Sequence, residues 1–125
     1  MNRISMISVA LAAAFALPAQ AQTEIQFWHS MTAVNGEWVN DLAKDFNSRQ
    51  SQYKIIPTFK GSYDESMTAA VAAFRAGNAP HVLQVFEVGT ATMMASKGAI
   101  IPAGQVMKDA GKKFDPASYV PAVAG

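Results

Sequence analysis

The chain has 125 residues, half of them apolar, and a formal net charge of +1 at neutral pH. This nearly balanced charge provides no excess of basic residues of the kind that nucleic acids or anionic membranes attract. The sequence contains no cysteine, which excludes disulfides within the chain and a lipid anchor attached through cysteine.

The first 21 residues have the features of an export signal. Arg3 supplies a positive charge, residues 4–17 form an uncharged apolar stretch, and Ala19-Gln20-Ala21 is an A-x-A cleavage site. The alternative is an uncleaved membrane anchor, but Pro18 and the small residues at the site favour cleavage. We therefore expect a mature chain of residues 22–125, which has 104 residues (125 minus 21) and no net formal charge.

A strand and a helix are predicted directly after the signal. In TEIQFWHS (residues 23–30), Ile25 and Phe27 alternate with polar neighbours, as in a short strand whose carboxyl end is Trp28-His29-Ser30. In residues 34–50, apolar side chains recur every three to four positions, which predicts a helix with one buried stripe. The predicted stripe consists of Val34, Trp38, Leu42 and Phe46, helped by Val39 and Ala43.

A second strand and a second helix follow. YKIIPTF (residues 53–59) is rich in strand formers, and Pro57 places it near a sheet edge, a bulge or a position that needs no ladder bond. Ser62-Tyr63-Asp64-Glu65 matches the S-x-x-E capping box that starts a helix, and Gly77 can end that helix. The predicted inward stripe of this helix comprises Met67, Val71 and Phe74.

HVLQVF (residues 81–86) is predicted to be a third strand, and its nearly continuous apolar character suits burial on both faces. Glu87 is expected to end this strand. A further helix is expected from about Gly89 to Lys97, followed by a weaker helical pattern at residues 105–110 and a helix start at Pro116.

The alternation of strand and helix predicts an α/β fold with a parallel sheet, right-handed crossovers and helices on both faces. In such sheets ligands bind beyond the carboxyl ends of the strands, where the strand order reverses. Residues 28–30, 60–63 and 87–90 are expected to reach this edge. Because a buried carboxylate without a partner is costly, we expect Glu87 to accept hydrogen bonds from a bound molecule there.

The candidate contacts at this edge also have structural interpretations. Tyr63 offers an apolar ring and a polar tip at the mouth of a pocket, or it covers the adjoining helix. Trp28 is either a stacking surface or a wall of the core, whereas a structural role is favoured for His29, and Ser30 can cap the next helix. Lys60 suits an anion, although a lysine beside a glycine is more often solvated.

Catalytic and metal-binding interpretations find little support in the residues. Ser30 or Ser62 could combine with His29 and Glu87 in a hydrolase, but no G-x-S-x-G elbow surrounds either serine. The two histidines and the scattered carboxylates lack metal-ligand spacing, and the glycines form neither a dinucleotide fingerprint nor a P-loop. The sequence therefore predicts no catalytic residue, metal or cofactor.

Three motifs resemble a known family: FWHSM (residues 27–31), AAFRAGNAP (72–80) and LQVFEVGTATMMAS (83–96). They are similar to the large family of periplasmic solute-binding receptors of ABC importers, extracellular solute-binding protein family 1, which includes maltose-type receptors. The resemblance covers essentially the whole mature chain. The last motif is long and specific, and it resembles the glycerol-3-phosphate receptors of this family.

The resemblance implies part of the amino-terminal lobe of a two-lobed periplasmic receptor, which closes on its solute without catalysis and passes it to ABC permease subunits in the inner membrane. The implied solute is glycerol-3-phosphate or a glycerophosphodiester. The ligand-contacting tyrosine and glutamate of the family match Tyr63 in KGSY and Glu87 in VFEVG. Because family members are several times longer, we expect an amino-terminal fragment. A receptor for another solute such as a sugar and an exported flavodoxin-like enzyme remain the alternatives.

Overall fold

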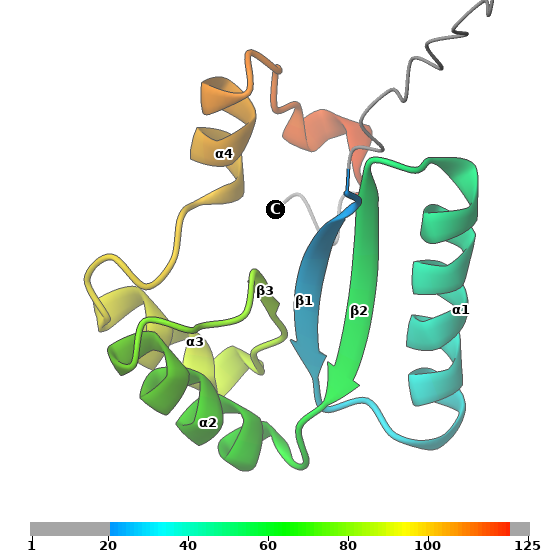
Figure 1. The fold of residues 1–125 in the computed structure, drawn as a ribbon. Helices are drawn as coiled ribbons and strands as arrows, with labels where there is room; N and C mark the ends of the chain where they lie inside the picture. Colours follow the sequence, from blue (N-terminus) through cyan, green and yellow to red (C-terminus); the bar gives the residue numbers. More distant parts are fainter. Residues whose placement is uncertain (1–20, 121–125) are drawn as a thin grey trace, which may run out of the picture.

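The computed structural model describes residues 21–120, so most of the predicted export signal lies outside the described residues. Within this range the chain forms three strands, four α-helices and one 3₁₀ turn (Figure 1). In chain order they are β1 (Thr23–His29), α1 (Ala33–Arg49), β2 (Tyr53–Phe59), α2 (Tyr63–Arg75), β3 (Val82–Leu83), α3 (Glu87–Ala95), α4 (Ala103–Asp109) and η1 (Pro116–Ser118).

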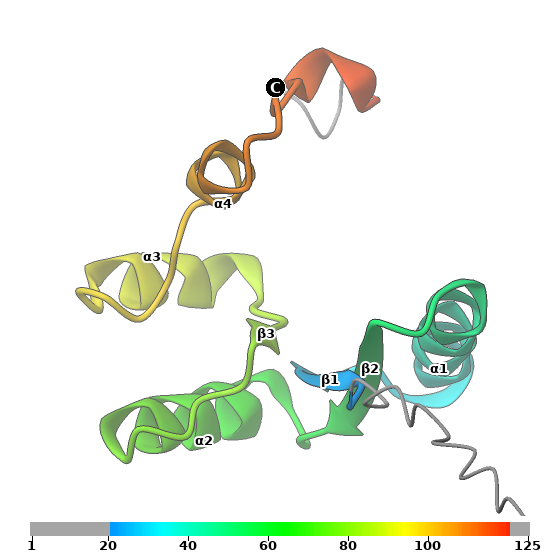
Figure 2. The same ribbon diagram turned by 45° about the horizontal axis from the view of Figure 1, so that its top comes forward.

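The strands form one parallel sheet with the order β2-β1-β3, which confirms the predicted α/β fold with a parallel-sheet core. β1 pairs with β2 along its whole length but with β3 only at Phe27 and Trp28. α1 lies beside β2, whereas α2 and α3 lie beside β3, so the helices flank the sheet from opposite sides (Figures 1 and 2). Since the chain passes from β2 across β1 to β3, the strand order reverses at β1.

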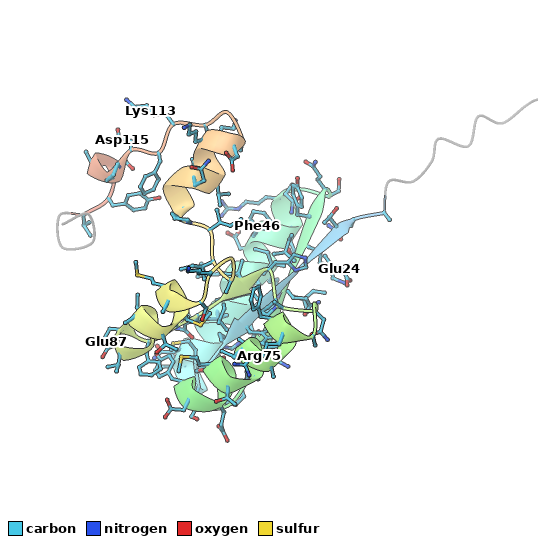
Figure 3. The ribbon with its side chains drawn as sticks, turned by 90° about the vertical axis from the view of Figure 1, so that its left-hand side faces the viewer. Glu24, Phe46, Arg75, Glu87, Lys113 and Asp115 are labelled. Atoms are coloured by element: carbon cyan, nitrogen blue, oxygen red, sulfur yellow. The ribbon has the colours of Figure 1, made fainter. Side chains whose placement is uncertain are left out.

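α1 matches the predicted helix but turns a different face toward the sheet. Val39 and Ala43 are buried, with only 7% and 6% of their surface exposed. The predicted buried stripe is wrong, because its four main members are 41% to 72% exposed. They are Val34, Trp38, Leu42 and Phe46, of which Figure 3 labels the last.

The buried face of α1 is selected by a polar residue on the same helical row. Asn47 follows Val39 and Ala43 at the four-residue spacing that places side chains on one side of a helix. Its Nδ2 donates to the carbonyl of Ile55 at 2.9 Å, and its Oδ1 accepts from the N–H of Ile55 at 2.8 Å. This double hydrogen bond turns the row of Asn47, rather than the bulkier apolar stripe, toward β2.

The outer edge of β2 is covered by side-chain amides. Besides Asn47 at Ile55, Gln50 bonds both backbone groups of Tyr53: Nε2 donates to the carbonyl and Oε1 accepts from the N–H, each at 2.7 Å. Pro57 is the next residue that faces this edge, and it has no N–H to leave unpaired. Its position on an edge strand confirms the prediction that Pro57 lies near a sheet edge. Free backbone groups on an edge strand invite pairing with other chains, and these contacts satisfy them.

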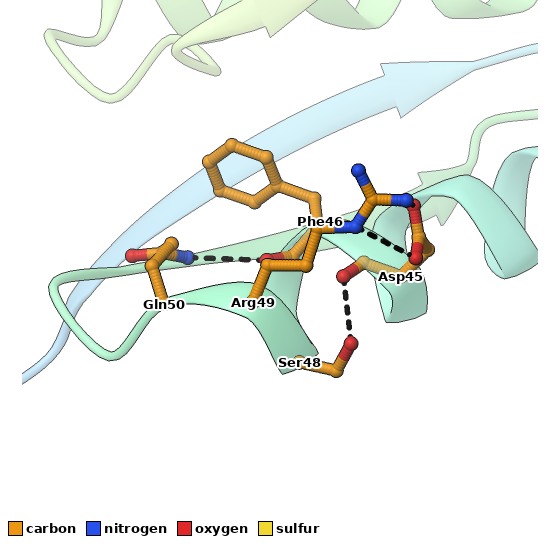
Figure 4. Close-up of polar contacts among 5 residues, drawn as sticks. All are labelled: Asp45, Phe46, Ser48, Arg49 and Gln50. Atoms are coloured by element: carbon orange, nitrogen blue, oxygen red, sulfur yellow. Dashed lines mark hydrogen bonds and ion pairs between the residues drawn. The ribbon is translucent and has the colours of Figure 1, made fainter.

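The last turn of α1 is held by local contacts (Figure 4). Arg49 contacts Asp45 through Nη2 at 2.5 Å and through Nε at 3.0 Å. The Oγ of Ser48 donates to the carbonyl of Asp45 at 2.8 Å, and Nε2 of Gln50 donates to the carbonyl of Phe46 at 3.5 Å. The exposed ion pair contributes little stability by itself, but together these bonds order the helix end that leads into β2.

The predicted capping box starts α2. The Oγ of Ser62 accepts from the N–H of Glu65 at 3.3 Å, and Oε2 of Glu65 accepts from the N–H of Ser62 at 2.7 Å. The backbone hydrogen bond, followed by the side-chain bond, lowers the pKa of Glu65 below its ordinary value. Because both bonds satisfy N–H groups that the helix leaves free, they fix the position at which the helix begins.

The inward face of α2 consists of small side chains. Ser66 and Ala70 are buried, whereas Phe74 is exposed, so the predicted inward stripe is wrong at Phe74. Phe74 lines a cavity beside β3, which leaves its ring accessible. α2 ends before Gly77, whose φ of +75° is the left-handed conformation predicted for it.

β3 is much shorter than the predicted strand at residues 81–86. Only Val82 and Leu83 pair with β1, and Val82 is exposed, so the expectation of burial on both faces is wrong. α3 runs from Glu87 to Ala95, two residues earlier than predicted at each end. Glu87 therefore starts a helix instead of ending a strand.

The apolar residues after β3 serve the contact between α2 and α3. A Cβ added to Gly89 would lie 2.9 Å from the Phe86 ring, 3.0 Å from the sulfur of Met67 and 3.1 Å from Val85. Gly89 thus permits a close approach of the two helices. Val85 and Phe86 lie against α3 at Gly89, and Phe86 also contacts the ring of Tyr63 at the start of α2, which explains their apolar character without a longer strand.

The last part of the chain agrees with the weaker sequence signals. α4 occupies the predicted helical stretch, and Oδ1 of Asp115 accepts from the N–H of Ala117 at 3.1 Å at the start of η1. Both elements lie away from β1 and β2 (Figure 2). Among the described helices, none is both long enough and apolar enough to cross a membrane.

We predict that Asn47→Ala lowers the free energy of unfolding by about 1 to 3 kcal/mol, because it leaves both backbone groups of Ile55 without a partner. Asn40→Ala is the matched control, since Asn40 is exposed on the same helix and should change stability by at most about 0.5 kcal/mol. Urea unfolding of both variants makes the comparison. Equal changes in stability in the two variants would show that the hydrogen bonds of Asn47 to Ile55 contribute no net stability.

Candidate ligand-binding site

The carboxyl ends of the three strands lie at one edge of the sheet, because the strands are parallel. The segments that follow β1, β2 and β3 begin at Ser30, Lys60 and Gln84. This is the edge at which the sequence predicts a binding site, and β1 lies at the reversal of strand order.

Hydrogen bonds join the segment after β1 to both of its neighbours. The N–H of Ser30 donates to Oε1 of Gln84 at 3.0 Å, and the N–H of Gln84 donates to the carbonyl of Trp28 at 2.9 Å. On the other side, the N–H of Lys60 donates to the carbonyl of His29 at 2.9 Å. The three segments therefore form one connected edge.

Tyr63 is the first residue of α2 and lies against the segment that precedes α3. The centroid of its ring is 5.3 Å from that of Phe86, at an interplanar angle of 31°. Phe86 immediately precedes Glu87, so this contact brings the starts of α2 and α3 together. The two predicted ligand-contacting residues, Tyr63 and Glu87, thus come from adjoining helix starts.

Glu87 is exposed at the first position of α3, as Figure 3 illustrates. Within residues 21–120 its carboxylate has neither a hydrogen bond nor an ion pair. The expectation that Glu87 follows a buried strand is wrong. Because the carboxylate is exposed, it needs no protein partner to offset a cost of burial. A carboxylate at a helix N-terminus is stabilised by the helix dipole, and its oxygens remain available as acceptors.

Trp28 and Lys60 form a pair that the sequence reasoning treated only as separate candidates. The Nζ of Lys60 lies 3.9 Å from the centroid of the Trp28 ring, in the geometry of a cation–π contact. The pair joins the ends of β1 and β2. In the register of the two strands, Lys60 lies two residues beyond Thr58, the partner of Trp28. The corresponding sequence signal is a cation directly after β2 and an aromatic residue near the end of β1.

His29 has a structural role, in agreement with its sequence interpretation. It is only 3% exposed, and its ring centroid lies 5.7 Å from that of Phe27 and 6.1 Å from that of Phe59. Its Nδ1 accepts from the N–H of Met31 at 3.3 Å. Burial lowers the pKa of His29, which keeps the imidazole neutral near neutral pH.

The sequence suggests that Ser30 can cap the next helix. The structure differs, because Ser30 does not cap α1. The N-cap of α1 is Thr32, and the buried Oγ of Ser30 has no hydrogen-bond partner among the described residues. Within the same part of the chain, no group of three or more His, Asp or Glu side chains could hold a metal ion.

A separate cavity of about 560 Å³ lies between α2, β3 and the end of α3. Its walls are mostly apolar, with Arg75, His81 and Lys97 among the lining residues, and they include neither Tyr63 nor Glu87. Because a polar solute needs convergent donors and acceptors, the edge at the strand ends suits such a ligand better than this cavity.

Comparison with known proteins identifies several relatives, although no family model matches the chain. The chain is 46% identical over 121 residues to the sn-glycerol-3-phosphate-binding periplasmic protein UgpB of Rhizobium meliloti. It is 57% and 53% identical, each over 123 residues, to proteins of the same name from Yersinia enterocolitica and Salmonella paratyphi A. These alignments cover 97% to 98% of this chain but only 28% of each relative.

We predict that the stability of the chain falls with acidification below pH 6.5, the ordinary pKa of histidine, through His29. The folded state resists protonation of the buried imidazole while the unfolded state accepts it, so stability is full above that pH and declines below it. The pKa of Glu65 is also lowered. Glu65 therefore reduces the stability only when the pH falls below 4.5, the ordinary pKa of this carboxyl group.

Urea unfolding of the parent and of His29→Gln between pH 4.5 and 7.5 measures this effect, with His81→Gln as the second-histidine control. His29→Gln should flatten part of the acid decline. A decline of the same size in this variant and the parent would assign the pH dependence to other groups.

Proposed function

We propose that this chain is part of a periplasmic receptor that binds glycerol-3-phosphate, or a glycerophosphodiester, and delivers it to an ABC permease. The observation that carries the proposal is 46% to 57% identity, over almost the whole chain, to proteins named for binding glycerol-3-phosphate in the periplasm. An exported flavodoxin-like enzyme is not favoured, because these relatives are named as binding proteins.

Tyr63 and Glu87 are proposed to contact the ligand. The parallel strands and the contact between Tyr63 and Phe86 support this assignment, because they bring the starts of α2 and α3 together at the strand-end edge. The exposed carboxylate of Glu87 can accept hydrogen bonds from hydroxyl groups without giving up any contact described for it. Tyr63 is 38% exposed, and a tyrosine can offer a ligand both an aromatic ring and a hydroxyl group.

The charge of Glu87 restricts how the ligand lies. A carboxylate beside a phosphate would repel it, so Glu87 is assigned to the glycerol hydroxyls and the phosphate to a position farther away. The phosphate then needs N–H donors or a guanidinium group. We assign these to other parts of a whole receptor, since the chain spans only 28% of the length of its relatives.

Residues 1–21 are proposed to act as an export signal, in keeping with the A-x-A motif and with the periplasmic names of the relatives. We predict that the exported protein begins at Gln22 and is recovered in the periplasmic fraction. Intact-mass measurement after cell fractionation tests this. Recovery of the chain in the membrane fraction with residues 1–21 still attached would contradict the assignment.

The binding site is best tested with this chain placed in the Yersinia enterocolitica relative, in exchange for its matching segment, so that a whole receptor is measured. We predict that Glu87→Ala weakens glycerol-3-phosphate binding by about ten- to a hundredfold, as expected for the loss of a charged acceptor. Tyr63→Phe should cost less, about two- to tenfold, because it removes one neutral hydroxyl and keeps the ring. Calorimetry measures both.

Glu37→Ala is the charge control for this experiment, because Glu37 is an exposed acid on α1 and should leave the affinity unchanged. A glycerol-3-phosphate analogue that lacks one hydroxyl supplies the specificity test. If Glu87 recognises that hydroxyl, Glu87→Ala should discriminate less between the two ligands than the parent does. Unchanged discrimination in a folded variant would make Glu87 a purely structural helix-start residue.

A further inference from the structure

We propose that Gln84 is a positioning residue for the proposed ligand site: its side chain ties the segment after β3 to the end of β1 and so holds Phe86 and Glu87 against Tyr63. This inference rests on the proposed function for its effect on ligand binding. Its structural part depends only on the contacts of Gln84.

The pairing of β3 with β1 is too short to position this segment by itself. Only two residue pairs, at Phe27 and Trp28, form the ladder. Beyond the two ends of this ladder, side chains that flank β3 accept hydrogen bonds from backbone N–H groups. One of these N–H groups belongs to β1 and the other to Ser30, the residue that follows β1. The N–H of Gln26 donates to Nδ1 of His81, and the N–H of Ser30 donates to Oε1 of Gln84, both at 3.0 Å.

These two side chains extend the ladder in opposite directions. The bond to His81 lies at the amino end of β3, far along the sheet from the strand-end edge. The bond to Gln84 lies at the carboxyl end, where the proposed ligand contacts gather. His81 therefore provides a comparison for Gln84, because it also accepts a backbone N–H, but in an exposed hydrogen bond outside the site.

Gln84 is also the last residue bonded to β1 before α3. Its backbone N–H donates to the carbonyl of Trp28 at 2.9 Å, and its side chain accepts from Ser30. After it, the described contacts of Phe86 are with the Tyr63 ring and with α3 itself. The orientation of the first turn of α3, and hence of Glu87, depends on this anchor three residues before the helix begins.

The hydrogen bond between Ser30 and Gln84 can hold the two segments together because of where it lies. The hydrogen bond between Ser30 and Gln84 is partly buried, so water replaces a lost acceptor poorly. With the acceptor removed, the N–H of Ser30 would lack a partner, and the side chain of residue 84 would no longer hold the two segments together. The carboxyl end of β3 would then separate from β1 more readily.

Gln84→Met and Gln84→Glu separate the shape of the side chain from its acceptor. Methionine has nearly the same length but cannot accept a comparable hydrogen bond, whereas glutamate retains a carboxyl oxygen in the same place. His81→Leu removes the acceptor at the other end of β3. Each variant is made in the whole receptor described above, alone and combined with Glu87→Ala.

Two readouts are measured. The first needs no ligand: nuclear Overhauser contacts between the Tyr63 and Phe86 rings, together with the amide chemical shift of Ser30. Gln84→Met should lose the ring contacts and shift the Ser30 amide, while Gln84→Glu and His81→Leu should retain the ring contacts. Retained ring contacts in Gln84→Met would overturn the proposal, whether or not the receptor binds glycerol-3-phosphate.

The second readout is the affinity for glycerol-3-phosphate. Gln84→Met should weaken it by about tenfold, and His81→Leu by less than about twofold, even if both lower the melting temperature equally. In the Glu87→Ala background, Gln84→Met should have little further effect, because Gln84 acts through the position of Glu87. If the losses of affinity in Gln84→Met and Glu87→Ala add fully in the double variant, Gln84 does not act through the position of Glu87. Failure of the parent receptor to bind glycerol-3-phosphate would reject the proposed function, and the ring contacts would then decide the role of Gln84.

Discussion

Backbone pairing on both sides of β1 is the constraint on which the rest of the described structure depends. β1 is the central strand, and its parallel pairing with β2 and β3 places three strand ends at one edge. The chain must return across the sheet after each strand, so α1 and α2 are required as crossovers. The helix starts that follow β2 and β3 consequently lie at the edge where β1 also ends.

Polar side chains complete the sheet where backbone pairing stops. Asn47 and Gln50 occupy the outer edge of β2, and His81 and Gln84 accept N–H groups beside the short β3. Each of these side chains comes from a segment adjacent to the strand that it serves. A sheet of only three strands has few ladder bonds, so these substitutes determine both the helix face that is buried and the course of the chain after β3.

The same arrangement explains how a site can form from residues that are distant in sequence. Tyr63 and Glu87 are the first residues of two helices, and Phe86 links them through its contact with the Tyr63 ring. Helix starts provide free N–H groups and a favourable place for a carboxylate, so the proposed contacts cost little local stability. The pair of Lys60 and Trp28 adds a cation at the same edge.

Local sequence signals by themselves determined where most elements begin and end. The capping box at Ser62, the left-handed Gly77 and the periodicity of residues 34–50 each act within a few residues, and the structure agrees with them. The alternation of elements was likewise sufficient for a parallel α/β fold and for the edge that gathers Tyr63 and Glu87. Only the tertiary structure decided which face of α1 is buried, how short β3 is and that Glu87 starts a helix. These features depend on hydrogen bonds and contacts between segments, such as that of Gln84 with Ser30, and apolar periodicity carries no information about such polar contacts across the chain.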